Sequence, residues 1–499
     1  MNGTQHHIIR RNRVTVNAVT SDGFALQSTI MRIMNGDVVT RLSSLFDSMC
    51  KEDEWLVIDK LDVSIDTLTE EELERNFADV LLKQIQEKIL ERIKFAEPKE
   101  KNRLDGQMKD RLLNINDRTF EAFLYFVEKG TLPWWYEITS HPEFERSILN
   151  LFDSPDYASF DKYLRPTSKA LQEEDAARRL VNQFGKEIVM MVLSFLMRQH
   201  SGLEPSSIQS AYEEITRIVN ARRSKVSGKI WSRLDAWLIQ KIAIPGGAPK
   251  GIIAEWFGEI IYRLYQDDPQ YIIKSIRKSK ILKQYLPIPL PVPDILGKGI
   301  NLETSPLLSE SNVGKELYEP GLNYQQQENS DSAENEAGMR VANAGLVILA
   351  PFLEQFFYSC HLLKEGSFTD KDKAMALLHY MVFGNLDYHE YNLSLPKVLC
   401  GVAETEPIEI VRKLSVKELD HAHDLLSAVI ENWSALKGTS PDGLREGFLQ
   451  RKGILNFKHD TWFLQVEQNT IDILLESLPW TISFIKLPWM KNFLRTQWT

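Results

Sequence analysis

The chain has 499 residues, of which 43% are hydrophobic and 26% charged, and its formal net charge is −10. This composition is typical of a folded protein with sizeable cores, and it excludes a collagen-like, fibrous or largely disordered chain. The acidic balance argues against nonspecific nucleic-acid binding, which needs a clustered excess of Lys and Arg. Basic stretches do occur near Arg10 and from Arg222 to Arg233, and solvated helix faces are the ordinary explanation of such runs.

The three cysteines, Cys50, Cys360 and Cys400, lie far apart in the sequence. They form neither a disulfide framework nor a CxxC metal site, so a reducing cytoplasmic compartment is expected. The N-terminus lacks the apolar core of a signal peptide. The most apolar runs, 188–197 and 345–357, are too short to span a bilayer. We therefore expect no membrane insertion, and a protein that is cytoplasmic at least during its early life.

Residues 1–100 predict an N-terminal α/β domain. Alternating polar and apolar residues indicate a half-buried strand within 7–19, and a helix is expected over 24–49. A second alternating segment at 55–65 predicts another strand. A Thr–Glu capping box then begins a helix that runs over 69–94.

Residues 101–285 predict a helical domain, because apolar residues recur there almost throughout at helical spacing. Residues 286–340 differ in composition. They begin with four prolines at alternate positions, which favour polyproline geometry. Residues 301–340 then carry eight acidic and two basic side chains, a net charge of −6. The sequence therefore predicts a flexible Pro-rich and acidic linker over 286–340.

Residues 341–499 predict a C-terminal helical domain that ends in a small β element. A Ser–Glu capping box opens a helix over 415–438, and Ser-Pro begins the next one. A hairpin is expected from strands at 454–457 and 462–466, and a further strand at 482–487. The predicted fold is mainly α, multidomain, with small α/β elements at both ends.

Catalytic and metal motifs are weak. No nucleophile elbow, Walker loop or GxGxxG occurs. His421 and His423 diverge on one helix and cannot share an ion. His379, Asp387 and His389 are candidates for a metal or hydrolase site, but they lack a fixed ligand spacing, and a core position explains His379. We predict no enzyme and no catalytic, cofactor-binding or metal residues.

Tryptophan is the unusual feature. The chain has 11 Trp, and the tripeptide Leu-Pro-Trp occurs at 132–134, 478–480 and 487–489. Proline fixes the backbone before a large rigid side chain, which suits an anchor that fills a pocket. That pocket belongs either to the protein's own core or to a partner. The candidate protein-interaction residues are Trp134, Trp135, Trp480 and Trp489.

Seven segments in order carry a family resemblance. They are HIIRRNRVTV near the start, LVIDKLDVSI at 56–65, FLYFVEKGTLPWW at 123–135, AGLVILAPFLEQFF at 344–357, LSLPKVLCG at 393–401, GLREGFLQRKGIL at 443–455 and LPWTISFIKLPWM at 478–490. Together they resemble the tape measure proteins of contractile injection systems, the extracellular phage-tail-like particles. The resemblance spans nearly the whole chain except the linker, and it implies an assembly factor without an active site.

The resemblance implies that inner-tube or baseplate proteins are the partners, with several copies per particle left open, and no nucleic acid. The first hypothesis is a structural protein that governs inner-tube length or assembly, cytoplasmic during assembly and then inside the tube lumen. The alternative is a cytoplasmic helical adaptor or chaperone for tube subunits or effectors, absent from the mature particle. No sustained heptads appear, and the longest helical pattern would span only about 40 Å, so either a linear ruler or a compact factor remains open.

Overall fold

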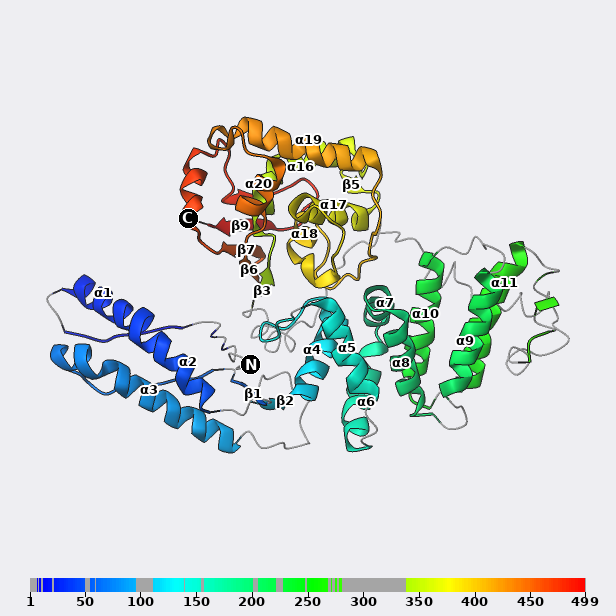
Figure 1. Ribbon diagram of the computed structural model, residues 1–499, viewed down its shortest axis with the longest axis horizontal. Helices are drawn as coiled ribbons and strands as arrows, with labels where there is room; N and C mark the ends of the chain where they lie inside the picture. Colours follow the sequence, from blue (N-terminus) through cyan, green and yellow to red (C-terminus); the bar gives the residue numbers. More distant parts are fainter. Residues whose placement is uncertain are drawn as a thin grey trace, which may run out of the picture. The chain divides into compact units, whose positions relative to one another are not determined.

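The computed structural model describes most of the chain (Figure 1). The described residues are 12–19, 22–49, 54–58, 60–95, 111–138, 140–153, 157–200, 205–220, 228–246, 249–267 and 338–498, with the isolated residues 7, 9, 271, 274–275 and 278–280. The predicted linker therefore lies outside the described residues up to residue 337, as does most of the second basic stretch. Helices predominate and the sheets are small, which confirms the predicted fold class.

The chain forms two compact units. The first holds the described residues of Met1–Thr119 and Trp135–Glu137. The second holds those of Phe120–Trp134, Ile138–Leu322 and Gly338–Thr499. The helical segment after residue 120 and the C-terminal segment after residue 338 thus belong to one unit, and contacts between them are contacts within that unit.

The first unit is built around a helix hairpin. One arm consists of α1 (Gly23–Ile33), a π-helical turn at Met34–Val38 and α2 (Val39–Asp47), and the other is α3 (Glu70–Phe95). Apolar residues from both arms pack together, and exposed Arg41 pairs with Asp79 across them. The predicted capping box is confirmed, because the Thr69 amide donates to the Glu72 carboxylate at 2.8 Å.

The strands of this unit differ from the prediction. β1 (Glu54–Val57) pairs antiparallel with β2 (Arg111–Asn114), so the second predicted strand is shorter than expected. The strand predicted at 7–19 is wrong for residues 12–19, which have no strand and whose side chains are exposed. Alternation shows which side chains share a face, but a strand also needs a neighbour to accept its backbone hydrogen bonds, and no described strand pairs with these residues.

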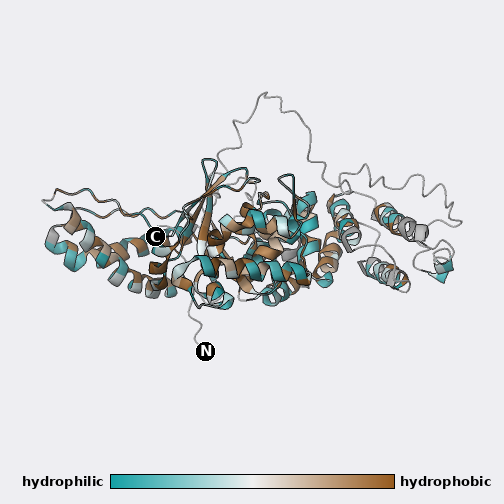
Figure 2. Ribbon diagram, turned by 90° about the horizontal axis from the view of Figure 1, so that it is seen from above, coloured by the Kyte–Doolittle hydropathy of each residue, from teal (hydrophilic) through white to brown (hydrophobic). Residues whose placement is uncertain are grey.

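The helical part of the second unit follows the predicted periodicity. Its helices are α4 (Ile115–Lys129, beginning in the first unit), α5 (His141–Asp153), α6 (Tyr157–Leu171), α7 (Glu174–Gln183), α8 (Lys186–Met197), α9 (Pro205–Asn220), α10 (Gly228–Ala243) and α11 (Pro249–Asp267). Hydrophobic and hydrophilic residues alternate around them (Figure 2). Aromatic rings fill the interior, with Phe123 against Phe152 and Phe184. Amphipathic helices bury such stripes against one another.

The C-terminal part has its own hydrophobic core. Its helical elements are η2 (Ala344–Phe352), α16 (Leu353–Ser359), α17 (Lys371–Phe383), η3 (Glu390–Asn392), α18 (Ser394–Leu399), α19 (Val416–Asn432), η4 (Ser434–Leu436), α20 (Pro441–Leu444), η5 (Arg445–Leu449) and η6 (Thr470–Ser477), and β4 (Leu363–Lys364) pairs with β5 (Ser367–Phe368). The predicted capping box of Ser415 and Glu418 is confirmed. The helix ends earlier than Gly438, because extended Trp433 turns its fully buried indole into the core.

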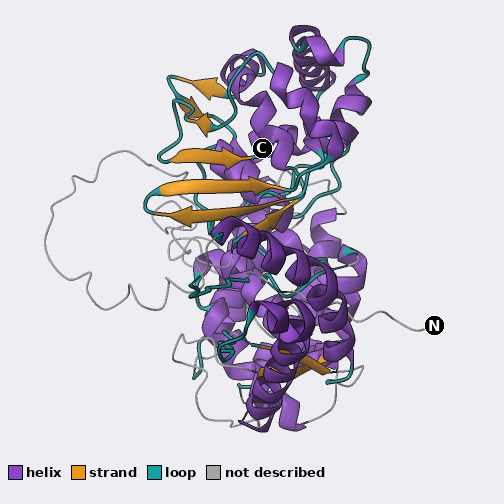
Figure 3. Ribbon diagram, turned by 90° about the vertical axis from the view of Figure 1, so that its left-hand side faces the viewer, coloured by secondary structure: helices purple, strands orange, loops and turns teal. Residues whose placement is uncertain are grey.

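A five-stranded sheet completes this part, in the order β3 (Met339–Val341), β6 (Gly453–Lys458), β7 (Thr461–Val466), β9 (Phe493–Gln497) and β8 (Phe484–Ile485) (Figure 3). The predicted hairpin is β6 and β7. The strand predicted at 482–487 is shorter, and β3 and β9 were not predicted. β9 runs parallel to β7, and the other neighbouring pairs are antiparallel.

Candidate functional site

Two of the four candidate tryptophans lie on the C-terminal core. Trp480 is half-buried, and its indole N–H donates to the Ile348 carbonyl at 3.0 Å. Trp489 is also half-buried and donates to the Leu399 carbonyl at 2.7 Å. Because each Nε1 has an internal acceptor and each ring packs on the core, these two Leu-Pro-Trp motifs stabilise the protein's own fold. Their role toward a partner stays a prediction.

The other two candidates lie just after α4. Trp134 belongs to the second unit and Trp135 to the first, and both are half-buried. The ring of Trp135 contacts Tyr136 edge to face, with 6.0 Å between centroids. The described contacts therefore do not join the four candidate tryptophans into one patch. Their interaction role also stays a prediction.

The three residues considered for a metal site are not brought together around an ion. His379 is 3% exposed and packs against the rings of Phe383 and Tyr388, and burial lowers its pKa to about 4. This is the core position expected from the sequence. Among the described residues, no group of three or more His, Cys, Asp or Glu side chains is placed to hold a metal ion.

The most strongly connected polar site is a buried charge cluster formed by Arg179, Glu390 and Lys397. Arg179 comes from α7, Glu390 begins η3 and Lys397 lies in α18, and all three side chains are at most 2% exposed. The Arg179 Nε donates to Glu390 Oε2 at 3.1 Å, and Lys397 Nζ donates to Glu390 Oε1 at 2.6 Å. One carboxylate thus bridges two cations from segments more than 200 residues apart in the chain.

Backbone carbonyls satisfy the remaining donors of the cluster. Lys397 Nζ also donates to the carbonyls of Glu404 and Glu406, at 2.7 and 2.8 Å. The Arg179 guanidinium donates to the carbonyl of Thr405 at 2.5 Å and to two carbonyls at the end of α4. Burial lowers the pKa of Lys397, and the Glu390 carboxylate opposes that shift. Buried charges need such pairing, because an unpaired one is strongly destabilising.

Gly130 makes room for the cluster. It ends α4 with φ +78°, and a Cβ added there would lie 2.3 Å from Glu390 Oε1 and 3.0 Å from Arg179 Nε. Glycine is therefore needed for two reasons, the left-handed backbone and the close approach of the carboxylate. Nothing in the sequence around this glycine connects it with Glu390, 260 positions later.

A pair of stacked histidines lies in the same unit. The rings of His141, from α5, and His389 are nearly parallel, with 3.2 Å between centroids and 12° between planes. His141 Nδ1 lies 3.2 Å from the Tyr391 hydroxyl. Burial lowers the pKa of His141, and burial, the neighbouring His141 and Arg412 lower that of His389 to about 3. Both shifts favour the neutral form of the imidazole, and Glu145, whose Oε1 lies 3.5 Å from His141 Nε2, opposes the shift of His141.

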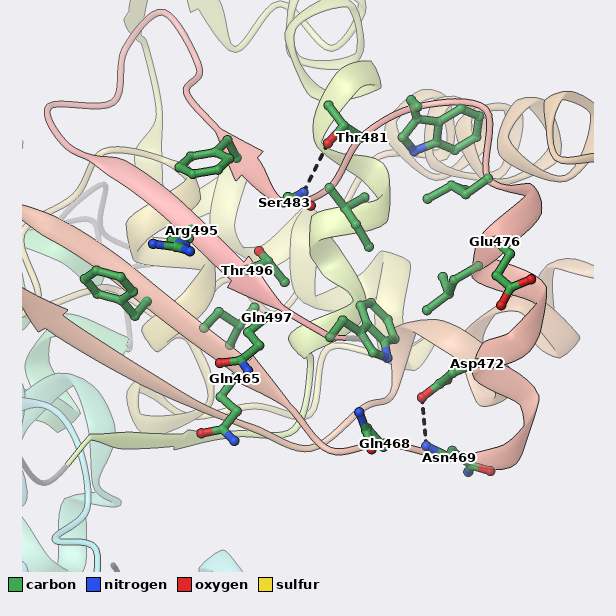
Figure 4. Close-up of a pocket in the computed structure, with 18 of the residues that line it drawn as sticks. Gln465, Gln468, Asn469, Asp472, Glu476, Thr481, Ser483, Arg495, Thr496 and Gln497 are labelled. Atoms are coloured by element: carbon green, nitrogen blue, oxygen red, sulfur yellow. Dashed lines mark hydrogen bonds between the residues drawn. The ribbon is translucent and has the colours of Figure 1, made fainter. Parts of the chain in front are cut away.

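An open hollow of about 1170 Å³ lies in the C-terminal part, between the end of β9 and η6 (Figure 4). Its polar lining includes Gln465, Glu476, Arg495 and Gln497, and Trp480 also contributes. Its carboxylates are Glu476 and Asp472, which pairs with Arg451 at 2.8 Å, and no His is among its lining residues.

The sequence missed the buried charge cluster. The one local signal is Lys397, a charge inside the apolar run Leu395–Leu399, where it must find a partner. Arg179 and Glu390 sit in stretches with other charges or polar residues, and nothing local indicates that they meet.

The family model for contractile injection system tape measure proteins matches residues 6–498. The chain belongs to the contractile injection system tape measure protein family. Members of this family are structural proteins, and membership implies contact with tube and baseplate components.

Other comparisons add nothing to this tape measure assignment. The chain matches no curated protein and no solved structure. In the part of the chain that the structure describes, no helix is long and apolar enough to cross a membrane.

Proposed function

We propose that this tape measure family protein governs the length or the assembly of the inner tube, and that it acts by contact alone. The family match over residues 6–498 carries the proposal. The described residues support it with a buried charge cluster that joins distant segments of the second unit and with an open hollow in the C-terminal part. In this proposal the protein is cytoplasmic while particles assemble and then lies in the tube lumen. The number of copies per particle is left open.

Deleting the gene tests this proposal directly. Particles from the deletion strain are expected to be irregular in length or missing, as measured by electron microscopy of purified particles. Supplying the intact chain from a plasmid is expected to restore the wild-type length distribution. Particles of normal length and number from the deletion strain would exclude a role in tube length or assembly.

A second candidate is a cytoplasmic adaptor or chaperone for tube subunits or effectors. One observation favours it. The longest described helix, α3, has 26 residues and spans only about 39 Å, so none of the described elements by itself provides the length of a linear ruler. Mass spectrometry of purified particles separates the two functions. A tape measure retained in the lumen is present in mature particles, whereas this chaperone copurifies with its client from cytoplasm and is absent from them.

A further inference from the structure

One side of the five-stranded sheet faces away from the C-terminal core, and we call it the open face. The strand register places Asn456, Phe463, Arg495 and Phe484 in one row across four neighbouring strands. Along β9 these outward residues are exposed and alternate with buried ones that face the core. The open face therefore consists of every second residue of each strand, as the pleat requires.

Positive charge collects on the open face although the chain as a whole is acidic. Arg340, Lys458 and Arg495 occupy it, one on each of three strands. The other outward strand positions are apolar, amide or hydroxyl residues, and none is Asp or Glu. Among the described residues, the acids nearest to the ends of β6 and β7 are Asp460 in the turn between them and Glu467 after β7. Glu336 precedes Arg340 by four positions in the sequence, outside the described residues. None of the three cations forms an ion pair with a described carboxylate.

Aromatic rings lie among these cations. Phe484 is 60% exposed and Phe493 52% exposed, which is unusual for side chains of this size on a folded surface. The Arg495 guanidinium lies 5.6 Å from the centre of the Phe484 ring, and Lys486 Nζ lies 5.0 Å from that of Phe493. Exposed cation–π contacts of this kind stabilise weakly, by about 0.5–1 kcal/mol, so they do not explain why two large rings remain in water.

The hollow of Figure 4 adjoins the open face and shares Arg495 with it. Two of its lining residues are more than nine-tenths buried and carry polar atoms without a hydrogen-bond partner, Thr496 Oγ1 and Trp498 Nε1. A buried indole N–H normally finds an acceptor. The hollow is therefore lined both by Arg495 of the open face and, from the core side of β9, by the indole N–H of Trp498, which has no acceptor among the described residues.

We propose that the open face and its hollow form the docking surface for an acidic protein partner, whose carboxylates pair with Arg340, Lys458 and Arg495 while its apolar groups cover Phe484 and Phe493. Charge complementarity carries the choice of partner, because three cations without an ion pair to any described carboxylate select negative charge. Exposed aromatic residues together with Arg are the composition that protein interfaces favour. The partner class rests on the proposed function, in which the chain contacts tube and baseplate proteins.

A protein fits this surface better than a nucleic acid. Nucleic-acid affinity depends on many phosphate contacts at once, and the open face supplies only three cations. The chain as a whole has a net charge of −10 and therefore repels a polyanion. A second copy of this chain would bring three like charges to the same face in an isologous dimer, which is unfavourable. The occupant is therefore a different protein with an acidic surface.

Binding measurements on the full-length chain test the proposal. The probes are the purified inner-tube and baseplate proteins of the same particle, measured by biolayer interferometry at low and high salt. We expect at least one of them to bind the wild-type chain, more weakly as salt rises. The double variant Arg495→Glu with Phe484→Ser should weaken that binding by about tenfold or more, since it replaces an attraction by a repulsion and removes an apolar anchor.

A matched control comes from α19 of the same part. Lys417 is exposed and Val416 is 73% exposed, so Lys417→Glu with Val416→Ser makes the same kinds of change elsewhere, and it should leave binding unchanged. Thermal unfolding of both double variants checks that each remains folded. The proposal is overturned if no tube or baseplate protein binds, or if the open-face and control variants bind like the wild type.

Two further results would also overturn it. Binding of a single-stranded oligonucleotide that the open-face variant abolishes would assign the surface to nucleic acid. A wild-type dimer in light scattering that the same variant dissolves would assign it to self-association. Should the deletion strain make normal particles while face-dependent binding persists, the proposed function fails and the docking surface stands. If the deletion strain makes irregular particles but the open-face variant binds like the wild type, the proposed function stands and the docking surface is overturned.

Discussion

The charged side chains of the buried cluster and those of the open face differ in burial and in pairing. In the cluster, one carboxylate and several carbonyls satisfy Arg179 and Lys397, and each side chain is at most 2% exposed. On the open face, three cations lie at outward positions without an ion pair to a described carboxylate. A satisfied buried network fixes the fold, because removing one member leaves a stranded charge. Exposed cations contribute little to folding and remain available to a partner.

The largest effect is expected from breaking the cluster. Glu390→Ala leaves Arg179 and Lys397 buried without their shared carboxylate, so we expect the free energy of unfolding to fall by about 3–5 kcal/mol. Urea denaturation measures this. Glu431→Ala, on the exposed side of α19, is the control and should change stability by less than about 0.5 kcal/mol. An equal, small change at both positions would contradict the assigned role of the cluster.

A smaller but specific effect is expected at Gly130. Gly130→Ala adds a Cβ that meets Glu390 Oε1 at 2.3 Å and also strains a left-handed backbone, so a loss of about 2–4 kcal/mol is expected. Gly246 is the matched control, because its φ is +79° but a Cβ there would meet nothing within 4 Å. Gly246→Ala should cost only about 1 kcal/mol. Similar losses from thermal unfolding of the two variants would show that the carboxylate contact does not matter.

Lowering the pH is expected to reduce the free energy of unfolding through the buried histidines and not through residues of the open face. Burial lowers the pKa of His379 to about 4 from an ordinary 6.5, so the unfolded chain binds this proton first as pH falls. The contribution of this group to stability is present above pH 6.5 and is lost as pH falls toward 4, by about 2 kcal/mol at pH 5. Buried His389, with its pKa lowered to about 3, adds a loss of the same sign that the His379 variant retains. His379→Phe should reduce this pH dependence in urea denaturation at pH 7.5 and 5, whereas His423→Phe, at an exposed position, should not. An unchanged pH dependence in the first variant would refute this.

The smallest effect on folding is expected at the open face. Arg495→Glu with Phe484→Ser should change the free energy of unfolding by less than about 0.5 kcal/mol, because the cation makes no ion pair with a described carboxylate and the ring is mostly exposed. Urea denaturation of this variant beside Glu390→Ala tests the comparison directly. A loss of several kcal/mol would mean that the open face belongs to the folding core.

The sequence predicted the structural features that depend on residues close together in the chain. Thr69 with Glu72 and Ser415 with Glu418 lie three residues apart, so both capping boxes were found and are confirmed. The hairpin of β6 and β7 is similarly local. The parallel pairing of β9 with β7 is not, because no turn signal joins them. The strand expected at 7–19 failed for residues 12–19, since alternation does not supply a pairing partner.

In the candidate site, too, the sequence predicted the features that depend on local residues and missed those that depend on tertiary contacts. The sequence singled out tryptophans, and the structure gives Trp480 and Trp489 internal acceptors, while their part in binding stays a prediction. It gave His379 a core position, which is confirmed. The charge cluster and the open face depend on tertiary contacts and on strand register, and neither can be derived from residue types along the chain.

The separation of Arg179 from Glu390 has a consequence for synthesis. These residues are 211 positions apart, and ribosomes add about 5–20 residues per second. For roughly ten seconds or more, a nascent chain therefore carries the guanidinium of α7 without its counter-ion, next to apolar surface that the C-terminal part later covers. We expect this interval to be the period when the growing polypeptide depends most on cellular chaperones, and when premature termination gives an aggregation-prone product.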